Sequence, residues 1–360
     1  MLSFLFNLKK MSNDIRQQYQ DEAYESLKGR SGCAVMPMRS GKTVVGLKVA
    51  DFYDEVLVAY PNKSIYEAWK SDSEKFGFDI SHITFTTFAS LDKHDLNDYD
   101  CVLIDEIDQL SEAKWNFVMS NRPKTLNGLT GTLPRKGTRK RFFIETLCPV
   151  RYERTIDETT GILNKPYHIY VHLVDPSEKR DIPRKSGGFW SEKAKVNFFE
   201  MHCNDNFAMM IKLIQSIAGS PTKWAKLREL LSSFDRCLVF VETIQQCNEI
   251  CRYTYHSKNS EATNKEALAK FNSGEVNFLA TINQLNAGVT FPNLNRAVLL
   301  HTYASSSKAA QRIARTLNFL EGEKAELHII CMNNTRDVAW TKKGLEYYGQ
   351  ENITWIKPKI

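Results

Sequence analysis

Residues 36–43 read MPMRSGKT and lie between a strand-length apolar run and a segment with helical periodicity. A loop that joins a strand to a helix can place backbone N–H groups and the helix N-terminus around phosphate oxygens. We expect Lys42 to reach the β- and γ-phosphates of a nucleotide and Thr43 to ligate Mg²⁺. Ser40 and Gly41 would line the same loop. The stretch therefore predicts a phosphate-binding turn.

A second stretch, VLIDEID at residues 102–108, is an apolar run that ends in two adjacent carboxylates, Asp105 and Glu106. In nucleotide hydrolases an Asp at this place holds Mg²⁺, and a neighbouring Glu polarises the attacking water. A bare GKT also occurs in ordinary loops, and the full pattern GxxxxGK[ST] requires Gly where Met36 stands. The two stretches together, 63 residues apart from Lys42 to Asp105, predict a site for ATP and Mg²⁺.

Short apolar runs alternate with helical segments along the chain, a pattern typical of parallel sheets covered by helices on both faces. The expected strands lie at 33–36, 56–60, 101–104, 126–129, 237–241, 277–282, 297–301 and 327–332. The sequence thus predicts an α/β fold with two parallel sheets. We expect a first domain at 1–150, a connector at 151–222 and a second domain at 223–360. The connector would hold a strand at 167–174 and a basic, turn-rich loop at 175–188.

The composition is that of a folded globular protein, with 360 residues of which 42% are hydrophobic and 25% charged. It excludes disordered and collagen-like chains. The net charge of +6 is uneven, because Lys and Arg balance Asp and Glu over residues 1–150 and exceed them by five over 223–360. Residues 135–141 hold five basic side chains in seven positions. This asymmetry suits a polyanionic partner, although charged runs are usually solvated surfaces.

Several further features concern the compartment in which the protein works. No apolar run approaches the ~18 residues of a membrane span, and the positive charges at the N-terminus follow its apolar stretch, unlike a secretory signal. We therefore expect no membrane association and a cytoplasmic location, the host cytoplasm if the chain is phage-encoded. The eight cysteines form no CxxC pair, which predicts buried thiols in a reducing compartment rather than a structural zinc site.

Additional stretches, in the same order along the chain, resemble the motifs of superfamily 2 helicases and translocases. The upstream element DIRQQYQ ends in Gln20 and resembles the family's LRxYQ element, whose Gln recognises adenine. LTGTLP at 129–134 resembles motif III, in which Thr130 and Thr132 would couple hydrolysis to movement. QRIART at 311–316 resembles motif VI. The remaining resemblances are to motif Ia at 58–63, motif Ib at 84–91, motif IV at 237–241 and motif V at 278–292.

This resemblance implies two RecA-like domains with a nucleotide cleft between them. The catalytic residues that it implies are Lys42, Asp105, Glu106, Gln311 and Arg315. The implied nucleotide contacts are Gln20, Ser40, Gly41, Lys42, Thr43, Gly288 and Arg312, and the implied Mg²⁺ ligands are Thr43 and Asp105. The residues expected to contact nucleic acid are Lys63, Thr86, Thr87, Arg135 and Thr281. Neither domain would then hydrolyse ATP alone.

The chain departs from the family pattern at several positions. In motif VI, Ala314 replaces the usual Gly and Asn318 stands where a second arginine belongs, so one arginine finger remains. Because such fingers stabilise charge on the transferring phosphoryl group, the loss of one could slow turnover. In motif V, Thr290 replaces an Asp that would bond the ribose. Met38 and Arg39 replace the usual Thr-Gly of the phosphate loop.

The form of motifs Ia and III is closer to DNA-acting branch-migration, repair and restriction-type translocases, and the compact chain resembles phage and viral members. We therefore expect an ATP-dependent helicase or translocase that acts on single-stranded, forked or branched DNA in replication, recombination or repair. An RNA helicase is an alternative. A nucleic-acid clamp or switch with weak ATP hydrolysis is another, which the departures from motif VI favour. The sequence leaves the oligomeric state open.

Overall fold

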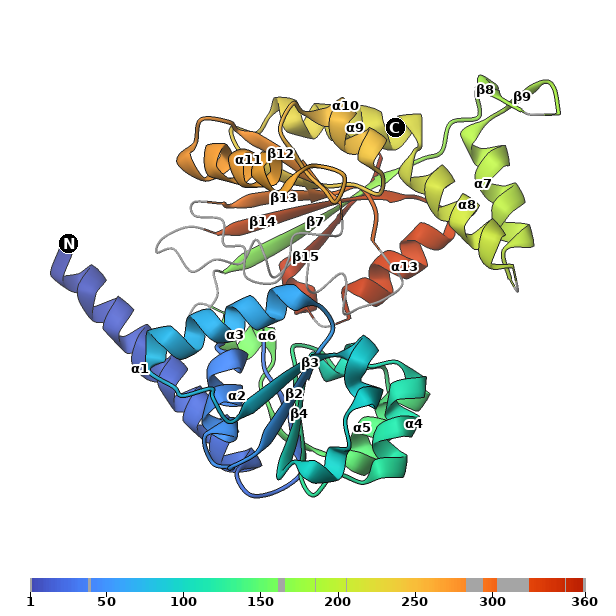
Figure 1. Ribbon diagram of the computed structural model, residues 1–360. Coiled ribbons are helices and arrows are strands. Elements are labelled where there is room, and N and C mark those ends of the chain that lie inside the picture. Colours follow the sequence, from blue (N-terminus) through green and yellow to red (C-terminus); the bar gives the residue numbers. More distant parts are fainter. Residues whose placement is uncertain are drawn as a thin grey trace. The chain divides into compact units, whose positions relative to one another are not determined.

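The computed structural model describes residues 2–37, 40–160, 166–184, 186–204, 206–282, 294–302, 324–346 and 348–358. These residues divide into two compact units, one up to residue 160 and one from residue 166 onward. Each unit is built on its own parallel sheet (Figure 1). This confirms the predicted α/β fold with two parallel sheets.

The first unit contains a six-stranded sheet with the strand order β3-β2-β4-β5-β1-β6, in which every neighbouring pair is parallel. Its strands are β1 (Gly32–Val35), β2 (Val56–Tyr60), β3 (Ile83–Thr87), β4 (Cys101–Asp105), β5 (Leu126–Thr130) and β6 (Val150–Glu153). Its helices are α1 (Leu2–Leu27), α2 (Lys42–Ala50), α3 (Lys63–Phe76), α4 (Glu112–Asn121), α5 (Arg139–Leu147) and α6 (Ile156–Thr159), with 3₁₀ turns η1 (Phe88–Lys93), η2 (Leu96–Asp98) and η3 (Ile107–Gln109).

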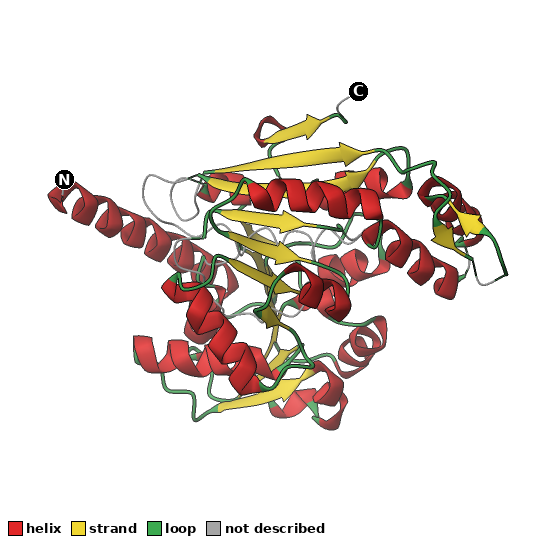
Figure 2. Cartoon of the chain, turned by 90° about the horizontal axis from the view of Figure 1, so that it is seen from above, coloured by secondary structure: helices red, strands yellow, loops and turns green. Residues whose placement is uncertain are grey.

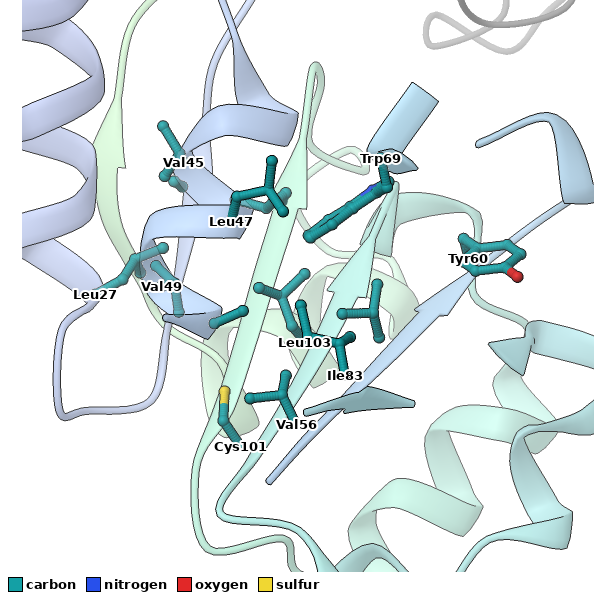
Figure 3. Close-up of a cluster of buried hydrophobic side chains, with 14 of the residues drawn as sticks. Leu27, Val45, Leu47, Val49, Val56, Tyr60, Trp69, Ile83, Cys101 and Leu103 are labelled. Atoms are coloured by element: carbon teal, nitrogen blue, oxygen red, sulfur yellow. The ribbon is translucent and has the colours of Figure 1, made fainter. Parts of the chain in front are cut away.

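The core of this unit lies on both faces of the sheet. Along β2, Val56 and Val58 join one hydrophobic cluster and Leu57 and Ala59 join the other, because successive strand side chains point to opposite faces. The first cluster, shown in Figure 3, is closed by α1, α2 and α3 and includes the fully buried Trp69. The second is closed by α4 and α5. Burial on both faces explains why the central strands are continuously apolar.

The second unit contains a seven-stranded sheet with the strand order β11-β12-β10-β13-β14-β7-β15, again parallel throughout. Its strands are β7 (Tyr167–Val174), β10 (Cys237–Phe240), β11 (Thr254–Tyr255), β12 (Phe278–Thr281), β13 (Arg296–Leu299), β14 (Ala325–Met332) and β15 (Ile353–Ile356). Its helices are α7 (Glu192–His202), α8 (Phe207–Ala218), α9 (Pro221–Ser232), α10 (Ile244–Ile250), α11 (Glu261–Ser273) and α13 (Arg336–Gly344), with the 3₁₀ turn η4 (Gln350–Asn352). Figure 2 shows the helices, in red, against the yellow strands.

The structure divides the expected connector at 151–222 between the two units. β6 extends the first sheet to Glu153, and β7 lies inside the second sheet, paired with β14 along all eight of its residues. The predicted strand at 167–174 therefore belongs to the second unit, which begins well before residue 223. Parallel pairing at full length makes β7 part of the core rather than a link.

The basic loop expected at 175–188 contains a short antiparallel ribbon, β8 (Ile182–Pro183) and β9 (Phe189–Trp190). Arg184 lies over the ring of Trp190 at 3.9 Å, and Trp190 also contacts Phe198 of α7 at a centroid distance of 5.3 Å. Phe189 is 58% exposed. Trp190 thus ties the ribbon to α7, whereas Phe189 faces solvent. In Figure 1 the ribbon, α7 and α8 lie together at one end of the second unit.

The cysteines are all free thiols, and seven of the eight are buried. Burial raises the pKa of Cys251 to about 11 and that of Cys247 and Cys331 to about 12, which keeps these thiols protonated and unreactive. Among the helices that the structure describes, none combines the length and the apolar character needed to cross a membrane.

Candidate nucleotide site

The phosphate-binding turn predicted at residues 36–43 leads from β1 into α2. Gly41 caps α2 at φ 92° and ψ 38°, a left-handed conformation that residues with a side chain rarely adopt. A Cβ atom at this position would lie 2.0 Å from Nε2 of Gln20. The hydroxyl of the buried Ser40 donates to the carbonyl of Pro37 at 2.7 Å. Only glycine therefore fits at residue 41.

Gln20, the predicted adenine-recognising residue, lies directly beside this turn. It is buried, and its Nε2 donates to the carbonyl oxygen of Ser40 at 3.1 Å. The residue projects from α1, so one hydrogen bond connects the N-terminal helix to the loop at the start of α2. The structure thus brings Gln20, Ser40, Gly41 and Lys42 together.

The two carboxylates predicted to act in catalysis lie at the carboxyl end of β4. Only β5 separates β4 from β1 in the sheet, so this end of β4 faces the turn. Nζ of Lys42 lies 3.9 Å from Oε1 of Glu106. Glu106 itself adopts φ 54° and ψ 50°, a left-handed conformation that is strained for a glutamate. Strain of this kind often marks a functional position, since it persists only where the surroundings impose it.

Asp105 is buried, and within the described residues its two oxygens accept hydrogen bonds from neutral donors. Oδ1 accepts from the backbone N–H of Glu106 at 3.0 Å, and Oδ2 accepts from Nε1 of Trp69 at 2.9 Å. Burial and the neighbouring charge of Glu106 raise the pKa of Asp105 to about 6, against the opposing effects of Trp69 and Lys42. A nearby cation would stabilise the charged form of a buried carboxyl whose pKa is raised in this way.

The residues around Asp105 fit a magnesium ion carried by a nucleotide. Mg²⁺ prefers oxygen ligands and in nucleotide sites takes one or two from protein and the rest from phosphates and water. Each oxygen of Asp105 has lone-pair capacity beyond its single hydrogen bond. Thr43 lies in the first turn of α2, half-buried. Thr43 and Asp105 would hold the ion, and Lys42 would contact the phosphates.

The predicted coupling element, motif III, is joined to the same carboxylate group. The hydroxyl of the fully buried Thr130 lies 2.9 Å from Oδ1 of Asp108 and accepts from the backbone N–H of Thr132 at 3.2 Å. Burial and the charge of Glu106 raise the pKa of Asp108 to about 7. The strand that carries Thr130 is β5, which lies between β1 and β4. Motif III is therefore connected to the carboxylates through Asp108, a residue that the sequence analysis did not select.

The residues predicted to contact nucleic acid differ in exposure. Lys63, at the start of α3, and Arg135 are exposed, and Thr87 is half-buried at the end of β3. Thr86 is 5% exposed, and its hydroxyl lies 3.1 Å from Nε2 of His94. Thr281 is fully buried, and its hydroxyl lies 3.0 Å from the carbonyl oxygen of Tyr255. Lys63, Thr87 and Arg135 can meet a ligand directly, whereas Thr86 and Thr281 face the protein interior.

The basic cluster at 135–141 is partly engaged within the protein. Arg139 pairs with Glu112 at 3.2 Å and Arg141 with Glu145 at 2.7 Å, and Lys140 donates to the backbone carbonyl of Asp108 at 3.4 Å. The exposed Arg135 and Lys136 precede α5. The N-terminal end of the cluster is thus the part best placed for an external anion.

Other predicted positions lie outside the described residues. They are Met38, Arg39, Gly288, Thr290, Gln311, Arg312, Ala314, Arg315 and Asn318. The described part of the site therefore comes from the first unit.

One residue of α3, Trp69, was not predicted as part of the nucleotide site. Its Nε1 donates to Oδ2 of Asp105. A signal was available only in that Trp69 follows motif Ia, since nothing in the sequence shows which side chains a helix turns toward a distant strand.

Comparison with known proteins shows a likeness to helicases. The helicase conserved C-terminal domain family matches residues 222–319. The fold matches the helicase domain of Hef from Pyrococcus furiosus, with a TM-score of 0.55, 14% identity, and coverage of 91% of this chain and 98% of that one. The chain is therefore similar to helicases over residues 222–319 and shares the fold of a helicase domain.

Two curated relatives make the likeness more particular. The "DNA 3'-5' translocase XPB2" of Sulfurisphaera tokodaii is 24% identical over 376 residues, which cover 91% of this chain and 84% of that protein. The "DNA 3'-5' helicase XPB" of Kineococcus radiotolerans is 22% identical, with coverage of 89% and 60%. The structure of the type ISP restriction-modification enzyme LlaBIII bound to DNA also shares the fold, with a TM-score of 0.61, 12% identity, and coverage of 94% of this chain and 31% of that one.

Proposed function

We propose that this protein is an ATP-driven DNA helicase or translocase that moves in the 3'-5' direction on single-stranded, forked or branched DNA. The observation that carries the proposal is the meeting of Lys42 with Glu106 beside the buried Asp105, at the carboxyl end of a parallel sheet. The two curated relatives named for DNA and for this direction support the choice of substrate. The protein would then act in replication, recombination or repair.

In the proposed mechanism the first unit binds and orients the nucleotide. Gly41 and the N-terminus of α2 present N–H groups to the phosphates, Lys42 adds a positive charge, and Gln20 contacts the base. Glu106 orients and polarises the attacking water. Mg²⁺, when bound, neutralises charge that develops on the transferring phosphoryl group. The lysine charge and the carboxylate positions are fixed before the reaction, so little reorganisation is needed.

The second unit would complete the site. We assign Gln311 and Arg315 to the transferring phosphoryl group on the basis of motif VI, and the exposed Lys63 and Arg135 to the DNA backbone. Phosphate contacts of this kind give binding that is independent of sequence and weakened by salt. Alternate binding and release by the two units would convert the hydrolysis cycle into movement along a strand.

The test is ATP hydrolysis by the purified protein alone and with single-stranded DNA, forked DNA and single-stranded RNA, with Lys42→Ala and Glu106→Gln as controls. We expect strong stimulation by DNA and loss of activity in both variants. A strand-displacement assay on duplexes with either a 3' or a 5' single-stranded tail then checks the direction. Stimulation by RNA alone would overturn the choice of substrate, and hydrolysis that no nucleic acid stimulates would overturn the motor.

A further inference from the structure

Helix α3 carries a side chain that contacts the candidate magnesium ligand Asp105. Trp69 is fully buried, and its indole N–H donates to Oδ2 of Asp105 at 2.9 Å. This side chain is thus the donor that fixes the orientation of one carboxylate oxygen, while the backbone N–H of Glu106 holds the other. With both oxygens bonded, the carboxylate cannot rotate without losing a hydrogen bond in a buried place, where such a loss is expensive.

The same indole ring packs against the helix that carries Lys42 and Thr43. A Cβ atom at Gly46 of α2 would lie 2.4 Å from Cη2 of Trp69, so the ring lies directly against the backbone of that helix. The ring of Phe85 from β3 packs against the indole at a centroid distance of 5.9 Å and an interplanar angle of 71°. Figure 3 shows Trp69 within this cluster of apolar side chains. Trp69 therefore spaces α2 from β4, the two elements that hold the candidate ligands.

We propose that Trp69 is a positioning residue for the magnesium site and acts through Asp105. This inference rests on the proposed nucleotide site. Outer-shell partners that orient metal ligands typically contribute 10- to 100-fold in metal affinity. Trp69 would set how strongly Mg²⁺ supports nucleotide binding, and it would touch neither nucleotide nor metal.

The experiment compares Trp69→Phe with Trp115→Phe. Trp115 is also fully buried in the first unit, and within the described part of the chain its Nε1 has no hydrogen-bond partner. Both variants shrink a buried indole to a phenyl ring, but only Trp69→Phe removes a hydrogen bond to Asp105. The readout is the affinity for a fluorescent ADP analogue in Mg²⁺ and in EDTA, together with the thermal midpoint of unfolding.

We expect Trp69→Phe to reduce the Mg²⁺-dependent gain in affinity about 10-fold or more while its affinity in EDTA stays near the wild-type value. Trp115→Phe should keep the wild-type gain even if it is equally destabilised.

The outcomes separate this inference from the proposed function. If Trp69→Phe and Trp115→Phe lose stability alike and both keep the wild-type Mg²⁺ dependence, Trp69 is a packing residue and the inference is overturned. If the wild-type protein binds no nucleotide in Mg²⁺, the nucleotide site itself is wrong and the proposed function fails with it. A Mg²⁺ defect that appears in Trp69→Phe and not in Trp115→Phe supports the inference even if DNA does not stimulate hydrolysis.

Discussion

Each unit of the molecule buries aspartates near the carboxyl end of a parallel strand, but the two units treat the negative charge in opposite ways. In the first unit, burial and Glu106 raise the pKa of Asp105 to about 6 and of Asp108 to about 7. In the second unit, burial by itself would raise the pKa of Asp337. Lys223 and His301 outweigh this effect and lower the pKa to about 2.

The two units differ in how closely a lysine of the protein approaches the buried carboxylates. Nζ of the fully buried Lys223 lies 2.6 Å from Oδ2 of Asp337 and donates to the carbonyl of Leu300 at 2.8 Å, and Nδ1 of His301 lies 3.3 Å from the other carboxylate oxygen. In the described part of the first unit, by contrast, the ion pair of Lys42 is with Glu106, at 3.9 Å. A structural carboxylate is neutralised by the chain itself, whereas a carboxylate meant for a metal is kept under-compensated. A buried carboxylate that the chain itself does not neutralise therefore marks a candidate functional site.

The largest effect should come from breaking the balanced pair. Lys223→Met leaves Asp337 buried without its cation, and the free energy of unfolding should fall by about 3–5 kcal/mol. The double variant Lys223→Met/Asp337→Asn removes the stranded charge and should recover part of that loss. Urea denaturation of the wild type and both variants measures the values. A double variant as unstable as the single one would show that the charge is not the cause.

Measurements at several pH values test the raised pKa of Asp108 in the first unit. The folded pKa of Asp108, about 7, lies above its ordinary value of 3.8, so the native state binds the extra proton between these values. Stability therefore falls as the pH rises from about 4 to about 7. Asp108→Asn keeps an acceptor for Thr130 and removes the charge, so its advantage over the wild type should grow across this window, to at most about 4 kcal/mol.

The measurement is the free energy of unfolding at several pH values from 4 to 8, without nucleotide. A difference between Asp108→Asn and the wild type that stays constant with pH would contradict the raised pKa. For Asp337, whose folded pKa is lowered, the sign is opposite. Its contribution is complete above about 4 and is lost as the pH falls toward about 2.

The third prediction separates activity from stability at one residue. Asp105→Asn keeps an acceptor for Trp69 but loses the charge that a cation requires. We expect ATP hydrolysis at saturating Mg²⁺ to fall on the order of 100-fold, which is about 2.7 kcal/mol of activation free energy. The urea midpoint at pH 8 should change little, because the removal of an under-compensated buried charge offsets the loss of the hydrogen bond from the backbone N–H of Glu106, which an amide nitrogen cannot accept. A parallel loss of stability and activity would place Asp105 with the structural carboxylates.

The phosphate-binding turn and the carboxylates of the first unit could be predicted from the sequence for a physical reason. β1 and β4 are buried on both faces, so they stand out as apolar runs, and the turn and carboxylates that follow them are adjacent in sequence. The edge strand β3 was not predicted as a strand, because ITFTT buries only some of its side chains. Trp69 and Asp105 are 36 residues apart, and their hydrogen bond depends on tertiary packing. Lys223 and Asp337 carry no motif at all, so their pairing could not be foreseen.

The smallest predicted effect concerns backbone strain in the two units. Glu106 at φ 54° and Asn334 at φ 55° adopt the same left-handed conformation, but Asn tolerates it far better than Glu. Glu106→Asn should therefore raise the free energy of unfolding by roughly 0.5–1 kcal/mol and abolish hydrolysis, whereas Asn334→Glu should lower it by a similar amount and leave hydrolysis unchanged. Thermal unfolding and ATP hydrolysis of both variants provide the check. If Glu106→Asn is not stabilised, the conformation at Glu106 stores no strain, and the contrast between the units rests on charge alone.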